Sequence, residues 1–273
     1  MRNNEERLGT KSDQSSPTTL SPLEFVSPTS FVKLPSEGLY YPEGHPLHNQ
    51  ETIEVKEMTA KEEDILTSKA LLEQGVAIDR LLTSLIVDKT IKTSSLLSGD
   101  RNAIMIQARI SAYGPSYKVA INCPACGEQG KHEFDLDGIH ASEVELHDAV
   151  EILPNNNIMV KLSNGWEVEC KMLDGSDEKR MLKESERKKK KKIPESPITD
   201  MLNTILVSVS GHKDTETIRK AVAHMPAKDT RLLREAYQTA IPNVDMSQTF
   251  ECPQCGHNED MEIPLSAEFF WPK

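Results

Sequence analysis

Apolar and polar positions along the first part of the chain predict one strand followed by helices. Residues 31–47 mix apolar anchors with proline and glycine, which indicates a packed irregular segment. Residues 52–58 alternate in polarity and predict a strand. Three helices are then expected, because apolar residues recur at three- and four-residue spacing. They cover residues 60–75, 77–87 and 100–112.

Capping residues mark where two of these helices begin. Thr59 is a suitable N-cap, and Glu62 stands three residues later, as in a capping box. Gly75 is expected to end that helix. Asp100 is expected to be the N-cap of the third helix.

Beyond residue 114 the pattern changes to paired strands. Residues 115–136 alternate in polarity on both sides of a Cys-Pro-Ala-Cys-Gly turn, and residues 248–265 repeat the arrangement around Cys-Pro-Gln-Cys-Gly. Residues 150–172 contain another hairpin, because the turn at Asn164 and Gly165 suits positive φ angles. Further helices are expected at residues 177–192, 198–210, 215–224 and 227–240.

Composition limits the classes of protein that this chain can represent. Its 273 residues, 37 % of them hydrophobic, suffice for one or two domains. Only 5 % are aromatic, which disfavours a sandwich or barrel lined by large rings. A formal charge of −11 disfavours nucleic-acid binding over the whole surface. No stretch approaches the roughly 18 consecutive apolar residues of a membrane-spanning helix, and the N-terminus lacks the apolar core of a signal peptide. We expect a soluble intracellular protein without a membrane partner.

The cysteines carry the most informative pattern. Four of the five form the two Cys-X-X-Cys pairs, and each second cysteine is followed by a glycine that tolerates positive φ. Two hairpin tips of this kind supply the four thiolates of a tetrahedral zinc site. We therefore predict one structural Zn²⁺ with a filled coordination shell and no open position for catalysis. The predicted ligands are Cys123, Cys126, Cys252 and Cys255.

Two alternatives to a zinc site remain open. A redox pair requires the motif to open a helix after a strand, whereas strands flank both pairs here. Unliganded thiols are the other possibility. His132 and His257 lie beside the tips and would act as ligands only if a cysteine did not. Cys170 lies on an alternating strand and is interpreted as a small buried apolar residue.

These features together predict an α+β fold. A helical N-terminal region precedes a zinc ribbon whose two hairpins are separated by an inserted α+β segment. The expected divisions are a disordered tail at 1–30, a mainly helical region at 31–114, a split ribbon at 115–136 and 246–266, an insertion at 137–245 and a C-terminal tail at 267–273. The first tail is rich in Ser, Thr and Pro, and the alternative is a binding arm that orders on a partner.

Other candidate chemistry is weak. His45 and His48 stand in an irregular loop and are expected to be solvated or capping residues. No nucleophile motif, phosphate-binding glycine loop or dinucleotide fingerprint is present, so no enzyme and no small-molecule substrate are expected. Arg101 and Arg109 are interpreted as a solvated helix face, with contacts to carboxylates of a partner as the alternative. The basic run Arg187 to Lys192 is interpreted as an exposed helix face, with nucleic acid as the alternative.

Several long strings resemble a known family. LPSEGLYYPEGHPL, IEVKEMTAKEEDILTS, LLSGDRNAIMIQARISAYGPSY and CPACG together resemble the baseplate hub and hub-assembly proteins of T-even-type contractile-tailed phages. The resemblance covers about residues 31–136, and the hairpin near 246–266 completes the ribbon. It implies a non-enzymatic structural or assembly role in the tail baseplate, with the four cysteines as zinc ligands. The segment 137–245 resembles nothing recognised.

Three functions follow from these features. The leading prediction is a baseplate hub structural or assembly protein that contacts other baseplate or hub tail proteins. It would be found in the host cytoplasm during assembly and, if it stays in the particle, in the virion tail baseplate. The alternative is a zinc-ribbon protein that binds nucleic acid or regulates transcription, which the acidic ribbon tip disfavours. A hydrolase hidden in the insertion is the third possibility.

Overall fold

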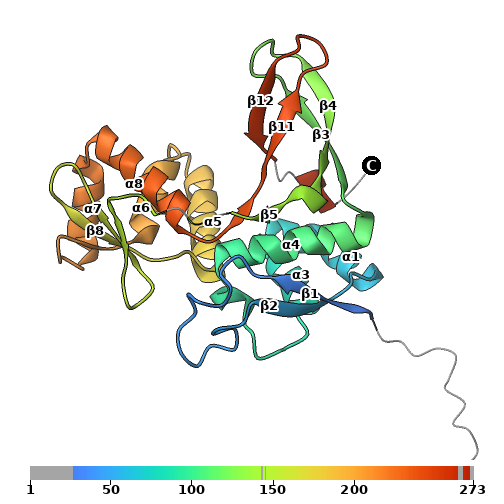
Figure 1. Ribbon diagram of the computed structural model, residues 1–273, viewed down its shortest axis with the longest axis horizontal. Helices are drawn as coiled ribbons and strands as arrows, with labels where there is room; N and C mark the ends of the chain where they lie inside the picture. The colour runs from blue at the N-terminus through green and yellow to red at the C-terminus, as the bar shows by residue number, and fades with distance from the viewer. Residues whose placement is uncertain (1–26, 143, 145, 264–266, 271–273) are drawn as a thin grey trace, which may run out of the picture.

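The computed structural model describes residues 27–142, 144, 146–263 and 267–270. Within this part of the chain the fold is mixed α+β. Figure 1 shows a body of helices and a hairpin, two hairpins that stand above it, and a lobe beside it. We call these the body (residues 29–113), the ribbon (116–135 with 247–262) and the lobe (150–240). The expected disordered tail lies mostly outside the described residues.

The body begins with a hairpin that the sequence indicated only in part. Strand β1 (Thr29–Lys33) pairs antiparallel with β2 (Thr52–Lys56) and buries Val32, Ile53 and Val55. The strand expected at 52–58 is confirmed at β2, but the irregular segment expected from residue 31 begins as a strand. Its partner is distant in sequence, so local pattern did not reveal the pairing.

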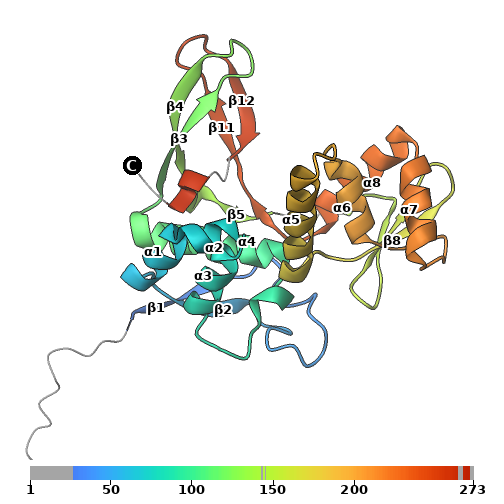
Figure 2. The same cartoon turned by 180° about the vertical axis from the view of Figure 1, so that it is seen from behind.

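Short helices then pack around one long helix, α4, at the centre of the body (Figure 2). The capping box is confirmed, because the Glu62 carboxylate accepts hydrogen bonds from Thr59 N at 3.0 Å and Thr59 Oγ1 at 2.5 Å. The helix expected at 60–75 is broken at Ser68 into two helices. The helices and the 3₁₀ turn of the body are α1 (Ala60–Thr67), α2 (Lys69–Glu73), α3 (Ala77–Leu85), η1 (Thr93–Ser95) and α4 (Ser98–Tyr113).

Asp100 is not an N-cap. Helix α4 begins at Ser98, so Asp100 is its third residue, and its side chain is fully buried. The carboxylate accepts hydrogen bonds from Ser36 N at 3.0 Å, Ser36 Oγ at 2.6 Å and Tyr41 Oη at 2.7 Å. Burial nevertheless raises the pKa of this carboxyl. Asp100 therefore fastens the irregular segment after β1 to the central helix.

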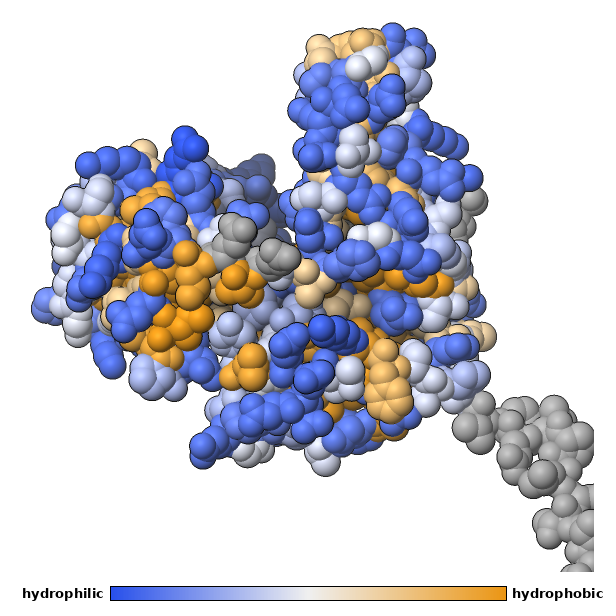
Figure 3. All heavy atoms as spheres, viewed as in Figure 1, coloured by the Kyte–Doolittle hydropathy of each residue, from blue (hydrophilic) through white to orange (hydrophobic). Residues whose placement is uncertain are grey.

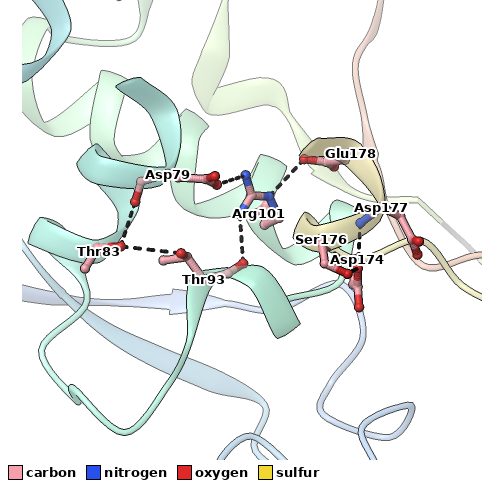
Figure 4. Close-up of polar contacts among 8 residues, drawn as sticks. All are labelled: Asp79, Thr83, Thr93, Arg101, Asp174, Ser176, Asp177 and Glu178. Carbon is pink, nitrogen blue, oxygen red and sulfur yellow. Dashed lines mark hydrogen bonds and ion pairs between the residues drawn. The ribbon is translucent and has the colours of Figure 1, made fainter. Parts of the chain in front are cut away.

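The expectation of a solvated face at Arg101 and Arg109 is wrong, because α4 is covered on several sides. Arg101 is 4 % exposed and Arg109 is 1 % exposed. Arg101 donates to Asp79 of α3 at 2.8 Å, to the carbonyl of Thr93 at 2.8 Å and to Glu178 of the lobe at 3.0 Å, as Figure 4 shows. This guanidinium joins the body to the lobe.

Arg109 lies where the ribbon meets the body. Its guanidinium donates to the carbonyls of Phe269 at 2.7 Å, Gly114 at 2.9 Å and Ser116 at 3.1 Å. Phe269 belongs to the 3₁₀ turn η3 (Ala267–Phe270) and is buried, so this part of the expected C-terminal tail packs into the core. The Arg109 side chain thus connects α4 to the first residue of the ribbon, Ser116, and to the 3₁₀ turn η3.

The ribbon consists of two antiparallel hairpins, β3 (Ser116–Asn122) with β4 (Gln129–Asp135) and β11 (Ser247–Glu251) with β12 (Asn258–Glu262). Both hairpins were expected. Alternation along β3 buries Tyr117, Val119 and Ile121 against Phe134 and Phe250. This core continues into α1, α3 and α4, so the ribbon is anchored on the body.

The lobe packs three helices, residues 197–205, 215–224 and 227–240, on a four-stranded antiparallel sheet, and together they form its apolar core. A fourth helix, residues 175–190, adds no residue to this core and contacts the helix at 197–205 and the body. The helix expected at 198–210 ends at Ile205, because residues 206–209 form a strand that pairs with β8. The helices expected at 215–224 and 227–240 are confirmed. The elements are β6 (Val150–Ile152), β7 (Ile158–Lys161), β8 (Glu167–Cys170), α5 (Gly175–Lys190), α6 (Pro197–Ile205), β9 (Leu206–Val209), α7 (Thr215–His224) and α8 (Ala227–Ala240).

The chain enters and leaves the lobe through one paired connection. Strand β5 (His140–Ala141) pairs antiparallel with β10 (Val244–Asp245), and Ser142 donates twice to the carbonyl of Asn243. A Cβ at Gly99 would lie 2.1 Å from the carbonyl oxygen of Pro242, so glycine lets the returning chain cross α4. No helix among the described residues is both long and apolar enough to cross a membrane.

Arg109→Met is expected to lower the free energy of unfolding by about 3 kcal/mol, because it removes three hydrogen bonds of a buried guanidinium, among them the buried bond to the Phe269 carbonyl. Arg231→Met is the matched control, since Arg231 is exposed on α8 and, among the described residues, forms an ion pair only with the exposed Glu235. Its expected cost is below about 1 kcal/mol. Urea unfolding of both variants measures the difference. Equal stability of the two variants would contradict the role given to Arg109.

Candidate metal centre

The two cysteine pairs lie at the tips of the ribbon hairpins in nearly identical turns. Gly127 N donates to the Cys123 carbonyl at 2.8 Å, and Gly256 N donates to the Cys252 carbonyl at 2.9 Å. The glycines have φ angles of +73° and +69°, which are unfavourable for residues with a Cβ. The same local sequence, Cys-Pro-X-Cys-Gly, therefore folds twice into the same turn.

The turns bring the four sulfur atoms together. All four lie within 4.8 Å of one another. Cys123 Sγ is 3.7 Å from Cys255 Sγ, and Cys126 Sγ is 3.9 Å from Cys252 Sγ. Sulfurs bound tetrahedrally at about 2.3 Å from one zinc lie about 3.8 Å apart. The cluster therefore has the dimensions of a four-thiolate metal site.

The electrostatics of the cluster favour a cation. Backbone N–H groups, first that of Cys126, lower the pKa of Cys123 to about 7. The His257 N–H group lowers the pKa of Cys255, but desolvation and hydrogen bonds with the other thiols outweigh it and raise that pKa to about 12. The first thiolate forms more easily than the others, and a cation between the sulfurs would favour the further thiolates at this spacing.

Burial divides the four cysteines between core and solvent. Cys123 and Cys252 are buried, and Cys126 and Cys255 are exposed. The buried pair continues the ribbon core, because both belong to the cluster that contains Phe250. The cysteine cluster therefore lies at the end of the apolar core of the ribbon, with two of its sulfur atoms close to solvent.

The other cysteine and the histidines do not join the cluster. Cys170 is fully buried in the lobe, and burial raises its pKa to about 12. His132 packs edge-on against Phe134 and Phe250, with ring centroids 4.6 and 5.2 Å away. The His257 ring lies 3.2 Å from the Glu259 carboxylate. Within the described residues, the group that could hold a metal ion consists of the four cysteines alone.

His45 and His48 lie in the body, away from any such group. His45 stacks on Tyr41 with ring centroids 4.4 Å apart, and its Nδ1 accepts a hydrogen bond from Leu47 N at 3.2 Å. His48 Nδ1 lies 2.7 Å from the Tyr41 carbonyl oxygen. Both rings therefore have the loop-capping role that the sequence suggested.

The charges around the ribbon are mainly acidic. Glu128, Glu251 and Asp260 are exposed near the tip. Glu133 forms an ion pair with Lys118 at 3.5 Å. The run of basic residues lies elsewhere, at the end of α5 in the lobe. Sequence reasoning located both features but could not show that other elements add cations beside α5.

Comparison with known proteins identifies the family of this chain. The family model described as T4 bacteriophage base plate protein matches residues 29–271. This range includes the lobe, which resembled nothing at the level of short strings. No curated protein and no solved structure matches. Since the match spans nearly the whole described chain, this protein belongs to the T4 bacteriophage base plate protein family.

Proposed function

We propose that this baseplate protein is a structural or assembly component of the central hub, and that it acts through contacts with other baseplate or hub tail proteins. The family match over residues 29–271 is the observation that carries the baseplate role. The hub assignment rests on the strings of the body that resemble hub proteins. We further propose that the protein acts in the host cytoplasm during assembly.

The surface supports a role in protein contacts. Figure 3 shows hydrophilic side chains over most of the ribbon in this view and a larger apolar area on the lobe. Several large apolar side chains are exposed on the body and lobe, including Phe31 at 70 %, Leu39 at 57 % and Leu182 at 44 %. Contiguous exposed apolar surface commonly marks contact sites for proteins.

A non-enzymatic role is part of the proposal. The apolar cavity of about 730 Å³ between α5, α6 and α8 is lined by side chains such as Leu173, Met201 and Ile241. Among its five charged side chains, Lys188 pairs with Asp200 at 2.6 Å and Glu178 pairs with Arg101 at 3.0 Å. The lining residues named here could pack against an apolar group, but they include no activated nucleophile. Nucleic-acid binding through the ribbon is the weaker candidate, because exposed carboxylates surround its tip.

We also propose that Cys123, Cys126, Cys252 and Cys255 bind one structural Zn²⁺. Sulfur separations of 3.7 and 3.9 Å support this assignment, as do the strands that flank both pairs. Four thiolates leave no position for water or substrate, so the ion would stabilise structure only. A zinc ion there would hold together residues 132 positions apart in the sequence.

Protein purified without chelator is expected to contain about one zinc per chain. Cys252→Ala should lose the metal, and Cys170→Ala, which removes the buried lobe thiol, should retain it. Chelation should raise amide hydrogen exchange in residues 247–251 and leave residues 158–161 protected, because the lobe has a separate core. Metal content far below one, or equal loss in both variants, would contradict the zinc assignment.

A null mutant of the phage is expected to assemble normal heads and to lack complete baseplates. Electron microscopy of infected-cell lysates measures this outcome, and complementation with the wild-type chain is the control. Normal infectious tails from the null mutant would refute the proposed function. Mass spectrometry of purified virions then separates a building block, present in stoichiometric amounts, from an assembly factor that leaves.

A further inference from the structure

The lobe contains a groove whose lining is strongly cationic. It has a volume of about 1130 Å³ and lies between α5, α6, β9 and the start of α7. Seven basic and two acidic side chains line it. The basic side chains are Lys171, Lys179, Arg180, Lys183, Arg187, Lys188 and Arg219. This local excess of positive charge stands in a chain of formal charge −11.

Helix α5 contributes a stripe of like charges. Lys179, Lys183 and Arg187 follow one another at four-residue spacing, so they lie on the same face of the helix. Like charges at this spacing destabilise a helix, since each repels the next. Arg219 on α7 and Lys171 after β8 extend the positive surface across the groove. Elements distant in sequence thus surround one concave region with cations.

The neighbouring carboxylates neutralise only part of this charge. Lys171 and Arg180 share the buried Asp177, at 2.6 and 2.9 Å. Lys188 pairs with Asp200 at 2.6 Å, and Arg187 pairs with Glu184. For Lys179, Lys183 and Arg219, by contrast, no ion pair exists within the described residues. These three exposed cations are therefore available to pair with an anionic group of a ligand.

The remaining lining distinguishes between possible anions. The groove is larger than the roughly 300–1,000 Å³ of a typical small-molecule site. Of the lining hydroxyl groups, Ser176 already donates to Asp174 at 2.6 Å and Thr204 to the Asp200 carbonyl at 2.8 Å. Thr215 adds a further hydroxyl group, and Leu206 and Val207 add apolar surface. None of the described lining residues is aromatic, so the groove lacks the stacking platforms that bind single-stranded nucleic acid. An extended peptide with carboxylate and apolar side chains fits this lining.

We infer that this groove, which we call the α5 groove, binds an acidic segment of a partner protein. The inference rests on the proposed function, because it names the kind of surface that a baseplate partner would present. Complementary charge would steer the encounter and fix the orientation of the partner, and added salt would weaken binding.

The direct test uses full-length protein and a fluorescein-labelled poly-glutamate peptide, with binding measured by fluorescence anisotropy. The variant K179E/K183E/R219E reverses the three unpaired cations and should weaken binding at least about tenfold. The control K118E/K131E/K161E makes the same change in net charge on the ribbon and on β7, and should alter binding less than about twofold. Circular dichroism and zinc content check that both variants fold. The milder variant K179Q/K183Q/R219Q should give an intermediate loss.

Several results would overturn the inference. These are no binding of the peptide by the wild-type protein, and equal weakening in the groove variant and its control. A third is displacement of the peptide by oligothymidylate more readily than by unlabelled poly-glutamate, which would make nucleic acid the ligand.

Complementation of the phage null mutant separates this inference from the proposed function. If the null mutant is defective but the groove variant restores normal tails, the groove inference fails and the proposed function stands.

Discussion

The sulfur cluster of the ribbon is the constraint on which the arrangement of this chain depends. Cys126 and Cys252 are 126 positions apart, yet their sulfurs lie 3.9 Å from each other. The hairpins that carry them share one apolar core, and Arg109 anchors the start of the ribbon to the body. The long segment between the hairpins therefore leaves and returns at one place, through β5 and β10. It can form a lobe with its own core without disturbing the ribbon.

Buried charge connects the three parts of the molecule. Arg101 contacts Asp79, Thr93 and Glu178, and so ties two elements of the body to the first turn of α5. Because Arg101 holds the first turn of α5 against the body, the stripe of cations on α5 has a fixed position relative to the body. The protein thus combines an acidic ribbon with a basic groove in the lobe. Such separation of charge favours oriented contacts with partners over general association.

The sequence allowed the α+β class, the cysteine turns and most helices to be predicted, because each depends on local signals. The capping box at Thr59, the glycines after the second cysteines and the Asn164 turn are such signals. The errors arose where a distant partner decides the structure. Strand β9 continues a helical pattern but pairs with β8, and β1 depends on β2. Arg109 resembles a surface residue in sequence, because the carbonyl of Phe269 that accepts its buried hydrogen bond lies 160 positions away. The α5 groove required the tertiary positions of Lys171 and Arg219.

The most direct test of the central claim is zinc K-edge X-ray absorption of the purified full-length protein. A site made of both cysteine pairs predicts four sulfur neighbours at about 2.3 Å and no nitrogen or oxygen ligand. The variant Cys170→Ala should give the same spectrum, since its thiol lies in the lobe. A first shell with two sulfurs and lighter atoms, or a spectrum that changes in Cys170→Ala, would contradict a ribbon held by all four cysteines at its tip.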